Sequence, residues 1–314
     1  MRAIAVQEFG AAPELIEAPK PEAGPGQILV KVEAAGVNPF DLKVGDGALD
    51  GSMPHDFPLI LGVDAAGTVE SVGEGVENFA AGDRVVGKFL TPPAGHGSYA
   101  EYVAGPAGGT ITKIPDGVTS EQAAALPIAG GTAQDLVDVL DLKPGQTVLV
   151  VGAAGGVGSY FVQLAAAVGA HVIATAHADD AERMRTLGAR EVVDHTAGPV
   201  ADAVKASHPD GVDALVDLVS GPDDLKALLP LLKSGGQIRT TTFAADDADI
   251  AARGLIGGNF ESRGGAPELA RLLAAVADGR LTVVLGRVVP LSEAPAALAD
   301  FRSGGNRGKT VLVP

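Results

Sequence analysis

The chain has 314 residues, of which 46% are hydrophobic and 20% charged, as in a globular protein large enough for two domains. Its 39 acidic and 23 basic side chains give a formal net charge of −16, which disfavours nucleic acid and anionic membrane surfaces as partners. No Cys is present, so disulfides, thiolate catalysis and Cys-ligated zinc are excluded.

The first part of the chain, to about residue 120, consists of short strand patterns broken by Gly and Pro. Residues 27–33 alternate apolar and polar side chains, which is the period of a half-buried strand. Residues 62–72 and 83–87 are further strand candidates, and a Gly-rich turn follows the first of them at 73–75. These patterns predict a β-rich domain.

From Ser120, the expected N-cap of a helix over 120–126, strands alternate with helical patterns. Such alternation predicts a parallel sheet with helices on both faces. The predicted strands are 147–151, 171–174, 192–194, 214–217 and 237–241, and the predicted helices include 157–168 and 181–187.

The tail from about residue 285 returns to a strand-like pattern and ends in a strand over 310–313. We expect this tail to complete the first domain. The predicted division is therefore a catalytic domain over 1–120 and 285–314, with an α/β cofactor domain over 121–284 inserted in it.

A Gly-rich turn connects the strand 147–151 to the helix 157–168. Free N–H groups at a helix N-terminus bind phosphate, and Gly lets the backbone approach it closely. The spacing is G-x-x-G-x-x-G, and no Lys follows the last Gly as a P-loop would require. The alternative is a simple tight turn, but the strand and helix on either side favour a dinucleotide pyrophosphate site. Its residues are Gly152, Ala154, Gly155, Gly156, Val157 and Gly158.

The side chains about 20 positions beyond this turn bear on which dinucleotide binds, because an NAD site usually has a carboxylate there. Residues 174–177 include none, which favours NADPH. Asp179 and Asp180 oppose this choice mildly by adding negative charge. The candidates to contact the 2′-phosphate, each of which could instead be an ordinary surface residue, are Thr175, His177, Arg183 and His195.

Eight segments occur in the order known from one enzyme family, namely 36–41, 61–67, 72–75, 82–85, 97–102, 130–133, 153–158 and 308–309. With them the chain resembles, nearly end to end, the quinone oxidoreductase (zeta-crystallin) branch of the medium-chain dehydrogenase/reductase superfamily. The resemblance implies a GroES-like catalytic domain with an inserted Rossmann domain. It also implies NADPH-driven reduction of quinones or α,β-unsaturated carbonyls.

The alcohol dehydrogenases of this superfamily bind catalytic zinc through a Cys and a Gly-His-Glu motif. The matching positions here are Asn38 and Gly62-Val63-Asp64. An amide and an alkyl side chain cannot replace thiolate and imidazole ligands. The six His show no ligand spacing, so we expect no metal site.

Without a metal, another group must stabilise the negative charge that develops on the substrate oxygen. Asn38 is the candidate hydrogen-bond donor, with Asp41 and Lys43 beside it. Asn38 could instead cap the turn before the following Pro, and Asp41 could be a structural helix cap. Many relatives carry a Tyr in the stretch that matches 47–49, and this chain has none there.

The resemblance implies further site residues. Those expected near the cofactor are Thr132, Val219, Phe243, Phe260 and Arg307, with Lys309 as another late contact. Those expected to line the substrate pocket, unless the aromatic ones belong to the core, are Phe40, Lys43, His55 and Phe57.

The leading hypothesis is an NADPH-dependent quinone or enone reductase, acting on a small molecule. Two alternatives remain, a biosynthetic enoyl reductase with a pathway-specific substrate and a non-catalytic NADPH-binding protein.

No apolar run approaches the roughly 20 residues of a membrane span, and the first ten residues lack a signal-peptide pattern, so we expect a cytoplasmic protein. Relatives commonly pair the sheet edges of their Rossmann domains, and we expect a homodimer with residues 281–289 at such an edge.

Overall fold

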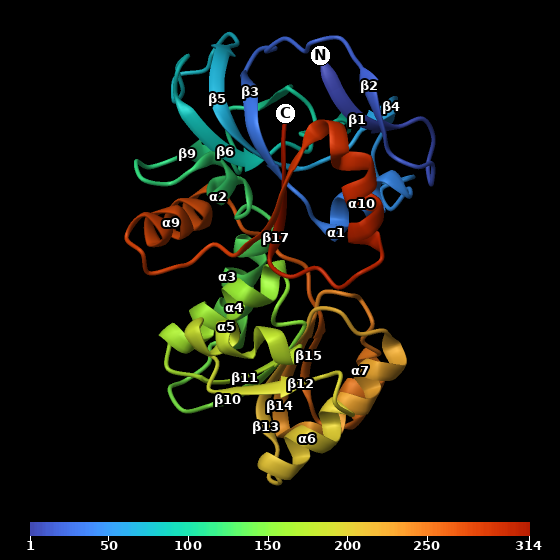
Figure 1. The fold of residues 1–314 in the computed structure, drawn as a ribbon, viewed down its shortest axis with the longest axis vertical. Coiled ribbons are helices and arrows are strands. Elements are labelled where there is room, and N and C mark those ends of the chain that lie inside the picture. The colour runs from blue at the N-terminus through green and yellow to red at the C-terminus, as the bar shows by residue number, and fades with distance from the viewer. The chain divides into compact units, whose positions relative to one another are not determined.

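The structure is a computed structural model that describes every residue from Met1 to Pro314. It consists of two compact units (Figure 1). The first comprises Met1–Gly131 and Gly264–Pro314, and the second comprises Thr132–Arg263. The second unit is thus an insertion in the first.

The divisions between the units differ from the expected ones at 120/121 and 284/285. Helix α9 (Ala266–Ala277) belongs to the first unit, where the Ala266 N–H donates to the Gly109 carbonyl at 3.3 Å. Leu272 of α9 and Leu126 both pack against Gly130. The helical pattern of α9 is visible in the sequence, but the sequence does not show which unit its apolar face covers.

The first unit contains two sheets. The larger has the strand order β16-β17-β3-β5-β6-β9, with β8 also paired to β3, and the smaller has the order β2-β1-β4-β7. The strands are β1 (Arg2–Val6), β2 (Glu14–Glu17), β3 (Gln27–Gly36), β4 (His55–Ile60), β5 (Asp64–Val72), β6 (Arg84–Lys88), β7 (Ala94–His96), β8 (Tyr102–Pro106), β9 (Thr112–Lys113), β16 (Leu285–Pro290) and β17 (Lys309–Val313). Its other helices are α1 (Pro39–Gly45), α2 (Ser120–Ala124) and α10 (Ala294–Arg302).

The long strand β3 holds this unit together, since it pairs antiparallel with β5, β8 and β17. Its alternating residues Ile28, Val30 and Val32 enter the core, as the period of the sequence predicts. The N-cap of α2 is Thr119 rather than the expected Ser120, because the Thr119 side chain accepts the Gln122 N–H.

The second unit is a doubly wound α/β domain. All pairs in its sheet are parallel, in the order β12-β11-β10-β13-β14-β15. Counted along the unit this is the order 3-2-1-4-5-6 of a Rossmann fold. The strands are β10 (Thr147–Val151), β11 (His171–Ala176), β12 (Glu191–Asp194), β13 (Val212–Asp217), β14 (Leu232–Thr240) and β15 (Ile256–Asn259).

Helices cover both faces of this sheet, as expected for parallel strands. On one face α6 (Val200–Ser207), α7 (Pro222–Leu228) and α8 (Asp247–Ala252) pack through Val204, Leu225 and Ile250. Helices α6 and α7 lie next to one another there (Figure 1). The remaining helices of the unit are α3 (Ala129–Leu140), which contains the first division, α4 (Gly156–Ala167) and α5 (Ala181–Thr186).

The segment 281–289 is not an edge of the Rossmann sheet. Its strand β16 pairs with β17 in the first unit, and the edges of the second unit's sheet are β12 and β15. The β-branched residues of 281–289 correctly indicate a strand, but this pattern carries no information about the sheet that the strand joins.

Candidate active site

Asn38 lies between the end of β3 and the start of α1, and only 2% of its surface is exposed. Its Nδ2 donates to Asp64 Oδ2 at 3.0 Å and to the Gly36 carbonyl at 3.3 Å. Its Oδ1 accepts from Lys309 Nζ at 2.7 Å. The amide of Asn38 therefore connects a buried carboxylate to a buried ammonium group.

Asp41 is held by two hydrogen bonds to one oxygen. Its Oδ2 accepts the Asn38 backbone N–H and the Tyr99 hydroxyl, both at 2.7 Å. The first bond closes the N-terminus of α1, so Asp41 has the structural role considered as an alternative. Tyr99 reaches Asp41 because Gly62, at φ +98°, has no side chain; a Cβ there would lie 2.3 Å from Tyr99 Cδ1.

The buried charges of this network shift one another's protonation. Burial and, to a smaller extent, the charge of Asp64 together raise the pKa of Asp41 to about 7, against the hydrogen bond from Tyr99. Burial also raises the pKa of Asp64 to about 6, although Lys309 opposes the rise. Burial lowers the pKa of Lys309. The network therefore binds and releases protons near neutral pH, instead of remaining fully charged.

The second carboxylate oxygens, Asp41 Oδ1 and Asp64 Oδ1, have no hydrogen-bond partner. Asp41 also lines a hollow of about 10 Å³, together with Gly62, Val63, Phe89 and His96. This is about the space that one water molecule needs. The Asp41 carboxyl thus has room beside it for a water that could carry a proton.

The expected pocket residues do not join this network. Lys43 is on the exposed side of α1, and Phe40 packs against the core of the first unit. His55 and Phe57 instead form an aromatic cluster with Phe9, with ring centroids 5.0 Å from those of Phe9 in edge-to-face geometry. Phe57 is 42% exposed, so this cluster presents an apolar surface.

The Gly-rich turn has the geometry of a phosphate cradle. It follows the buried strand β10 and ends at Gly155, the N-cap of α4. Gly152 has φ +84°, and its N–H donates to Thr175 Oγ1 at 3.1 Å. Thr175, 2% exposed, therefore anchors the turn from the neighbouring strand β11.

Gly155 and Gly158 are needed for different reasons. A Cβ on Gly155 would meet only the Gly152 carbonyl, at 3.4 Å, so the space beside Gly155 is open to a ligand. A Cβ on Gly158 would lie 2.4 Å from that carbonyl and 2.6 Å from Ala153 Cα. Gly158 therefore permits close packing of α4 on the turn, and is required by the protein itself.

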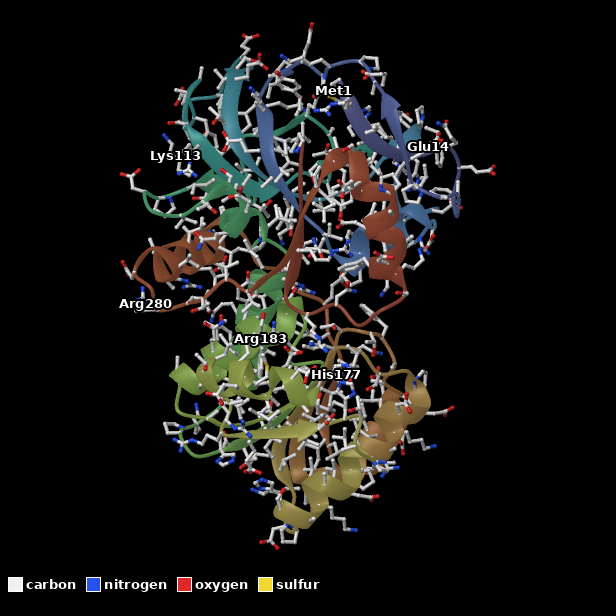
Figure 2. All side chains as sticks on the ribbon, viewed as in Figure 1. Met1, Glu14, Lys113, His177, Arg183 and Arg280 are labelled. Atoms are coloured by element: carbon white, nitrogen blue, oxygen red, sulfur yellow. The ribbon has the colours of Figure 1, made fainter.

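The candidates for the 2′-phosphate form two groups. Arg183 of α5 donates to the Ala154 carbonyl of the turn at 3.5 Å and forms an ion pair with Asp180 at 2.9 Å. The rings of His177 and His195 lie 4.6 Å apart. His177 and Arg183 both belong to the second unit (Figure 2). The pairing with Asp180 reduces the positive charge that Arg183 offers a phosphate.

Three expected cofactor contacts follow the carboxyl ends of parallel strands, which is where ligands bind in such sheets. Val219 follows β13 and packs against Gly152, since a Cβ on that Gly would lie 2.8 Å from Val219 Cγ1. Phe243 follows β14 and is 59% exposed. Phe260 follows β15, and its N–H donates to the Thr240 carbonyl at 2.8 Å.

Thr132 and Arg307 belong to different units. Thr132 is buried in α3, whereas Arg307 is exposed just before β17.

The residues of the second unit fit a nicotinamide dinucleotide, because the Gly-rich turn leaves space at Gly155 and the N-terminus of α4 points into that space. When bound, such a cofactor supplies a hydride from C4 of its nicotinamide.

Sequence reasoning missed the inner part of the network in the first unit. Lys309 is expected at a cofactor or substrate, but it is 3% exposed and donates to Asn38 and to the Val37 carbonyl. Tyr99 lies in the matched segment 97–102, yet its bond to Asp41 spans 58 residues of sequence. The one available signal in the sequence was the position of Lys309, directly before the predicted strand 310–313. A Lys that is buried at such a place needs a partner of opposite charge or a hydrogen-bond acceptor.

Comparisons with known proteins agree with this architecture. Residues 24–116 match the alcohol dehydrogenase GroES-like domain, and residues 187–312 match the zinc-binding dehydrogenase domain. A chloroplast envelope quinone oxidoreductase homolog of Arabidopsis thaliana is 33% identical over 100% of this chain and 98% of its own. The mitochondrial NAD(P)H oxidoreductase RTN4IP1 of Mus musculus is 31% identical over 92% of this chain and 82% of its own.

A solved structure extends the likeness to three dimensions. The quinone oxidoreductase from Coxiella burnetii superposes with a TM-score of 0.90 at 31% identity, covering 100% of this chain and 99% of that one. A GroES-like unit with an inserted Rossmann unit and a phosphate-binding turn defines a nicotinamide-dependent oxidoreductase. The chain belongs to the quinone oxidoreductase family of the medium-chain dehydrogenase/reductase superfamily.

The residues at the zinc position of the superfamily's alcohol dehydrogenases do not fit the metal. Asn38 and Val63 supply an amide and an alkyl group where thiolate and imidazole are needed, and Asp64 is already bonded to Asn38. The ammonium of Lys309, 2.7 Å from Asn38 Oδ1, opposes a second cation.

Among the helices of the structure, none combines the length and the apolar character that a membrane span requires.

Proposed function

We propose that this chain reduces quinones or α,β-unsaturated carbonyls with NADPH and without a catalytic metal. The observation that carries the proposal is the hydrogen-bonded series Lys309, Asn38, Asp64, which takes the place of a zinc ligand set. A protein cation in that place provides fixed positive charge without a metal ion.

Asn38 has the role of an activated donor in this proposal. Lys309 bonded to Oδ1 withdraws electron density from the amide and makes the Nδ2 hydrogens more acidic. Of the two Nδ2 bonds, the one to the Gly36 carbonyl is longer, 3.3 Å against 3.0 Å to Asp64. A substrate oxygen that gains negative charge replaces the longer bond, while Asp64 keeps the amide in position.

Asp41 is the proposed proton source. Its burial raises its pKa to about 7, so it holds a proton for part of the time at neutral pH. The hollow beside it has room for the water that would pass this proton outwards. Tyr99 donates to the other carboxylate oxygen and so orients the group.

The preference for NADPH has its support in the second unit. Residues 174–177 contain no carboxylate to receive a ribose hydroxyl or to repel a 2′-phosphate. Arg183 lies against the turn, and His177 and His195, whose rings lie 4.6 Å apart, are candidate hydrogen-bond donors to the phosphate.

The test is steady-state NADPH oxidation with a panel of quinones and enones, before and after exhaustive chelation. We expect turnover with members of the panel and no loss on chelation. Asn38→Asp, which keeps the size of the side chain and removes the donor, should lower kcat at least about tenfold, or about 1.4 kcal/mol. Asn78→Asp is the matched control, because Asn78 bonds the Ala107 carbonyl outside the network.

Two results would overturn the proposal. The first is turnover that disappears with a chelator and returns with zinc. The second is binding of NADPH without oxidation by any quinone or enone, which would instead indicate a non-catalytic NADPH-binding protein. Full activity in Asn38→Asp would leave the reaction class intact and remove Asn38 from it.

A further inference from the structure

Three side chains with metal-binding atoms meet in the second unit, at the end of its sheet where the parallel strands begin. His171 is the first residue of β11, Glu191 is the first residue of β12, and His208 is the C-cap of α6. One ligand atom from each lies within 4.8 Å of the others. The prediction of no metal site, based on the absence of Cys, on Asn38 and Val63 and on the spacing of the His residues, does not take this meeting into account.

The fold brings them together through ordinary strand and helix geometry. β11 and β12 are parallel, with Ile173 opposite Glu191, so the starts of both strands reach the same edge. Helix α6 follows β12 and runs back along the sheet, with its C-cap at this same edge; the His208 N–H donates to the Val204 carbonyl at 2.8 Å. Spacings of 20 and 17 residues from Glu191 conceal the cluster in the sequence.

The two imidazoles point at one carboxylate oxygen. Nε2 of His171 and Nε2 of His208 both contact Glu191 Oε1, the latter at 2.9 Å, and the two rings lie 5.7 Å apart at 71°. Two neutral imidazoles and one carboxylate form a protein ligand set that suits zinc and leaves one position for water. The side chains are 30%, 33% and 18% exposed for His171, Glu191 and His208, so an ion can enter from solvent.

The charge of the cluster also suits a cation. Glu191 supplies a carboxylate oxygen, which is an anionic metal ligand. An imidazole binds a metal ion through the lone pair of an unprotonated ring nitrogen, and the Nε2 atoms that contact Glu191 Oε1 already point at the place of such an ion.

We propose that His171, Glu191 and His208 bind a divalent transition-metal ion of the zinc type, which links β11, β12 and α6. The site is separate from the proposed reaction, because the phosphate-binding turn follows β10 at the opposite, carboxyl end of the sheet. The length of β11 alone, 6 residues, separates the two edges by about 20 Å. The ion would therefore stabilise the unit and take no part in reduction.

The experiment is calorimetric titration of the full, tag-free and metal-depleted chain with Zn²⁺, repeated with Co²⁺ to record its visible absorption bands. We expect saturation at one ion per chain, tetrahedral cobalt bands and a rise in Tm with Zn²⁺, because an ion that binds only the folded state stabilises it. His208→Gln and Glu191→Gln should each weaken binding at least about tenfold, which is the lower end of what even outer-shell changes cost.

The matched control is His96→Gln, since His96 contacts only one acidic partner, Asp56, and should keep the wild-type affinity. The pair His177 and His195 is a competing place for an ion, and the double variant His177→Gln/His195→Gln tests it. Thermal unfolding without metal shows that each variant folds. Absence of saturable binding, equal affinity in wild type and His208→Gln, or loss of binding only in the His177/His195 variant would each refute the site.

Discussion

Lys309 Nζ donates a hydrogen bond to Asn38 Oδ1 across 2.7 Å, although 271 residues separate the two in the chain. The contact exists because β17, which begins at Lys309, pairs with the end of β3, which leads to Asn38. Strand pairing thus places a cation beside the buried carboxylates of Asp41 and Asp64.

Removal of this cation should destabilise the first unit. Lys309→Met leaves Asp41 and Asp64 without the buried cation that is linked to Asp64 through Asn38. Removal of one partner of a buried ionic group lowers the free energy of unfolding by about 3–5 kcal/mol. Urea unfolding of the variant measures the loss. Adding Asp64→Asn should restore part of it, while Lys43→Met, an exposed change on α1, should stay within about 0.5 kcal/mol of wild type. A Lys309→Met protein as stable as wild type would contradict the account.

Stability should fall as pH rises through neutrality because of Asp41. Its pKa is raised to about 7 in the folded chain, above its usual value of 3.8, so the folded state binds more protons between these values. The contribution of the group is therefore greatest below pH 4 and is lost by pH 8. From about 1.4 kcal/mol per pKa unit, the loss between pH 5 and pH 8 is about 2.5 kcal/mol.

The measurement is the free energy of unfolding at pH 5 and pH 8 in wild type and Asp41→Asn. The variant keeps an oxygen that accepts from Asn38 and Tyr99 but does not ionise. Its stability should change less over this interval. Parallel pH dependences of the two proteins would show that Asp41 does not titrate there.

Gly155→Val should fold and lose NADPH affinity. The new Cβ meets only the Gly152 carbonyl at 3.4 Å, so its remaining atoms enter the space of the phosphate. We expect a rise in Kd of at least about tenfold, or about 1.4 kcal/mol, by fluorescence titration. Gly158→Val should instead lower stability, because its Cβ would lie 2.4 Å from the backbone.

The control for the turn is Gly198→Val, where a Cβ meets nothing within 4 Å. Unchanged NADPH affinity in a folded Gly155→Val protein would show that the phosphate binds elsewhere.

NADPH should bind more tightly than NADH. A charge-assisted contact to the 2′-phosphate contributes about 1.5–3 kcal/mol, which is about a 10- to 100-fold preference. The ion pair of Arg183 with Asp180 places the expected value at the low end. Arg183→Ala should reduce the preference, and Arg185→Ala, on the same helix but paired with Glu182, should not.

Dissociation constants of His177→Gln and His195→Gln separate the contributions to this preference. If His177 or His195 contacts the phosphate, the preference for NADPH shrinks in the corresponding variant. A preference that both variants keep would assign the contact to Arg183. Tighter binding of NADH than of NADPH by the wild type would contradict the choice of cofactor.

A dimer, if it forms through Rossmann sheet edges, should use β15 and not residues 281–289. β15 is an edge strand of the second unit, and its first residue, Ile256, is 55% exposed. Ile256→Lys should convert a dimer to a monomer in light scattering, whereas Val288→Lys on β16, where Val288 is 49% exposed, should not. A dimer that persists in Ile256→Lys and is lost in Val288→Lys would exclude β15 as the interface.

The sequence predicts the elements of the fold better than their assembly. Residues 147–151 are predicted as a strand and form one, because a short β-branched run bounded by polar and Gly residues is typical of a strand buried on both faces. Residues 266–284 were expected in the cofactor domain, but α9 belongs to the first unit, and the strand character of 281–289 was assigned to an edge of the Rossmann sheet, whereas β16 pairs with β17. Periodicity reports which side of an element is buried, and it contains no information about the partner that buries it.

The same limit applies to the sites. The phosphate-binding turn is contiguous in sequence and is therefore visible there. The partners of Asn38 come from β5 and β17, and Asp41 has a partner in the segment after β7. The metal-binding cluster comes from two strands and a helix end. Such groups are defined by strand register, which emerges only when the sheets are formed.

The insertion of the second unit has a consequence for the order in which this protein is made. β3, β5 and β8 leave the ribosome before the inserted unit, and β17 leaves after it. Until then, one edge of β3 lacks part of its pairing, and Asp41 and Asp64 lack the ammonium of Lys309. The inserted unit can complete its own sheet first, since domains fold as units during synthesis. The charge balance of the first unit is thus a late event in biosynthesis, coupled to the arrival of a single strand.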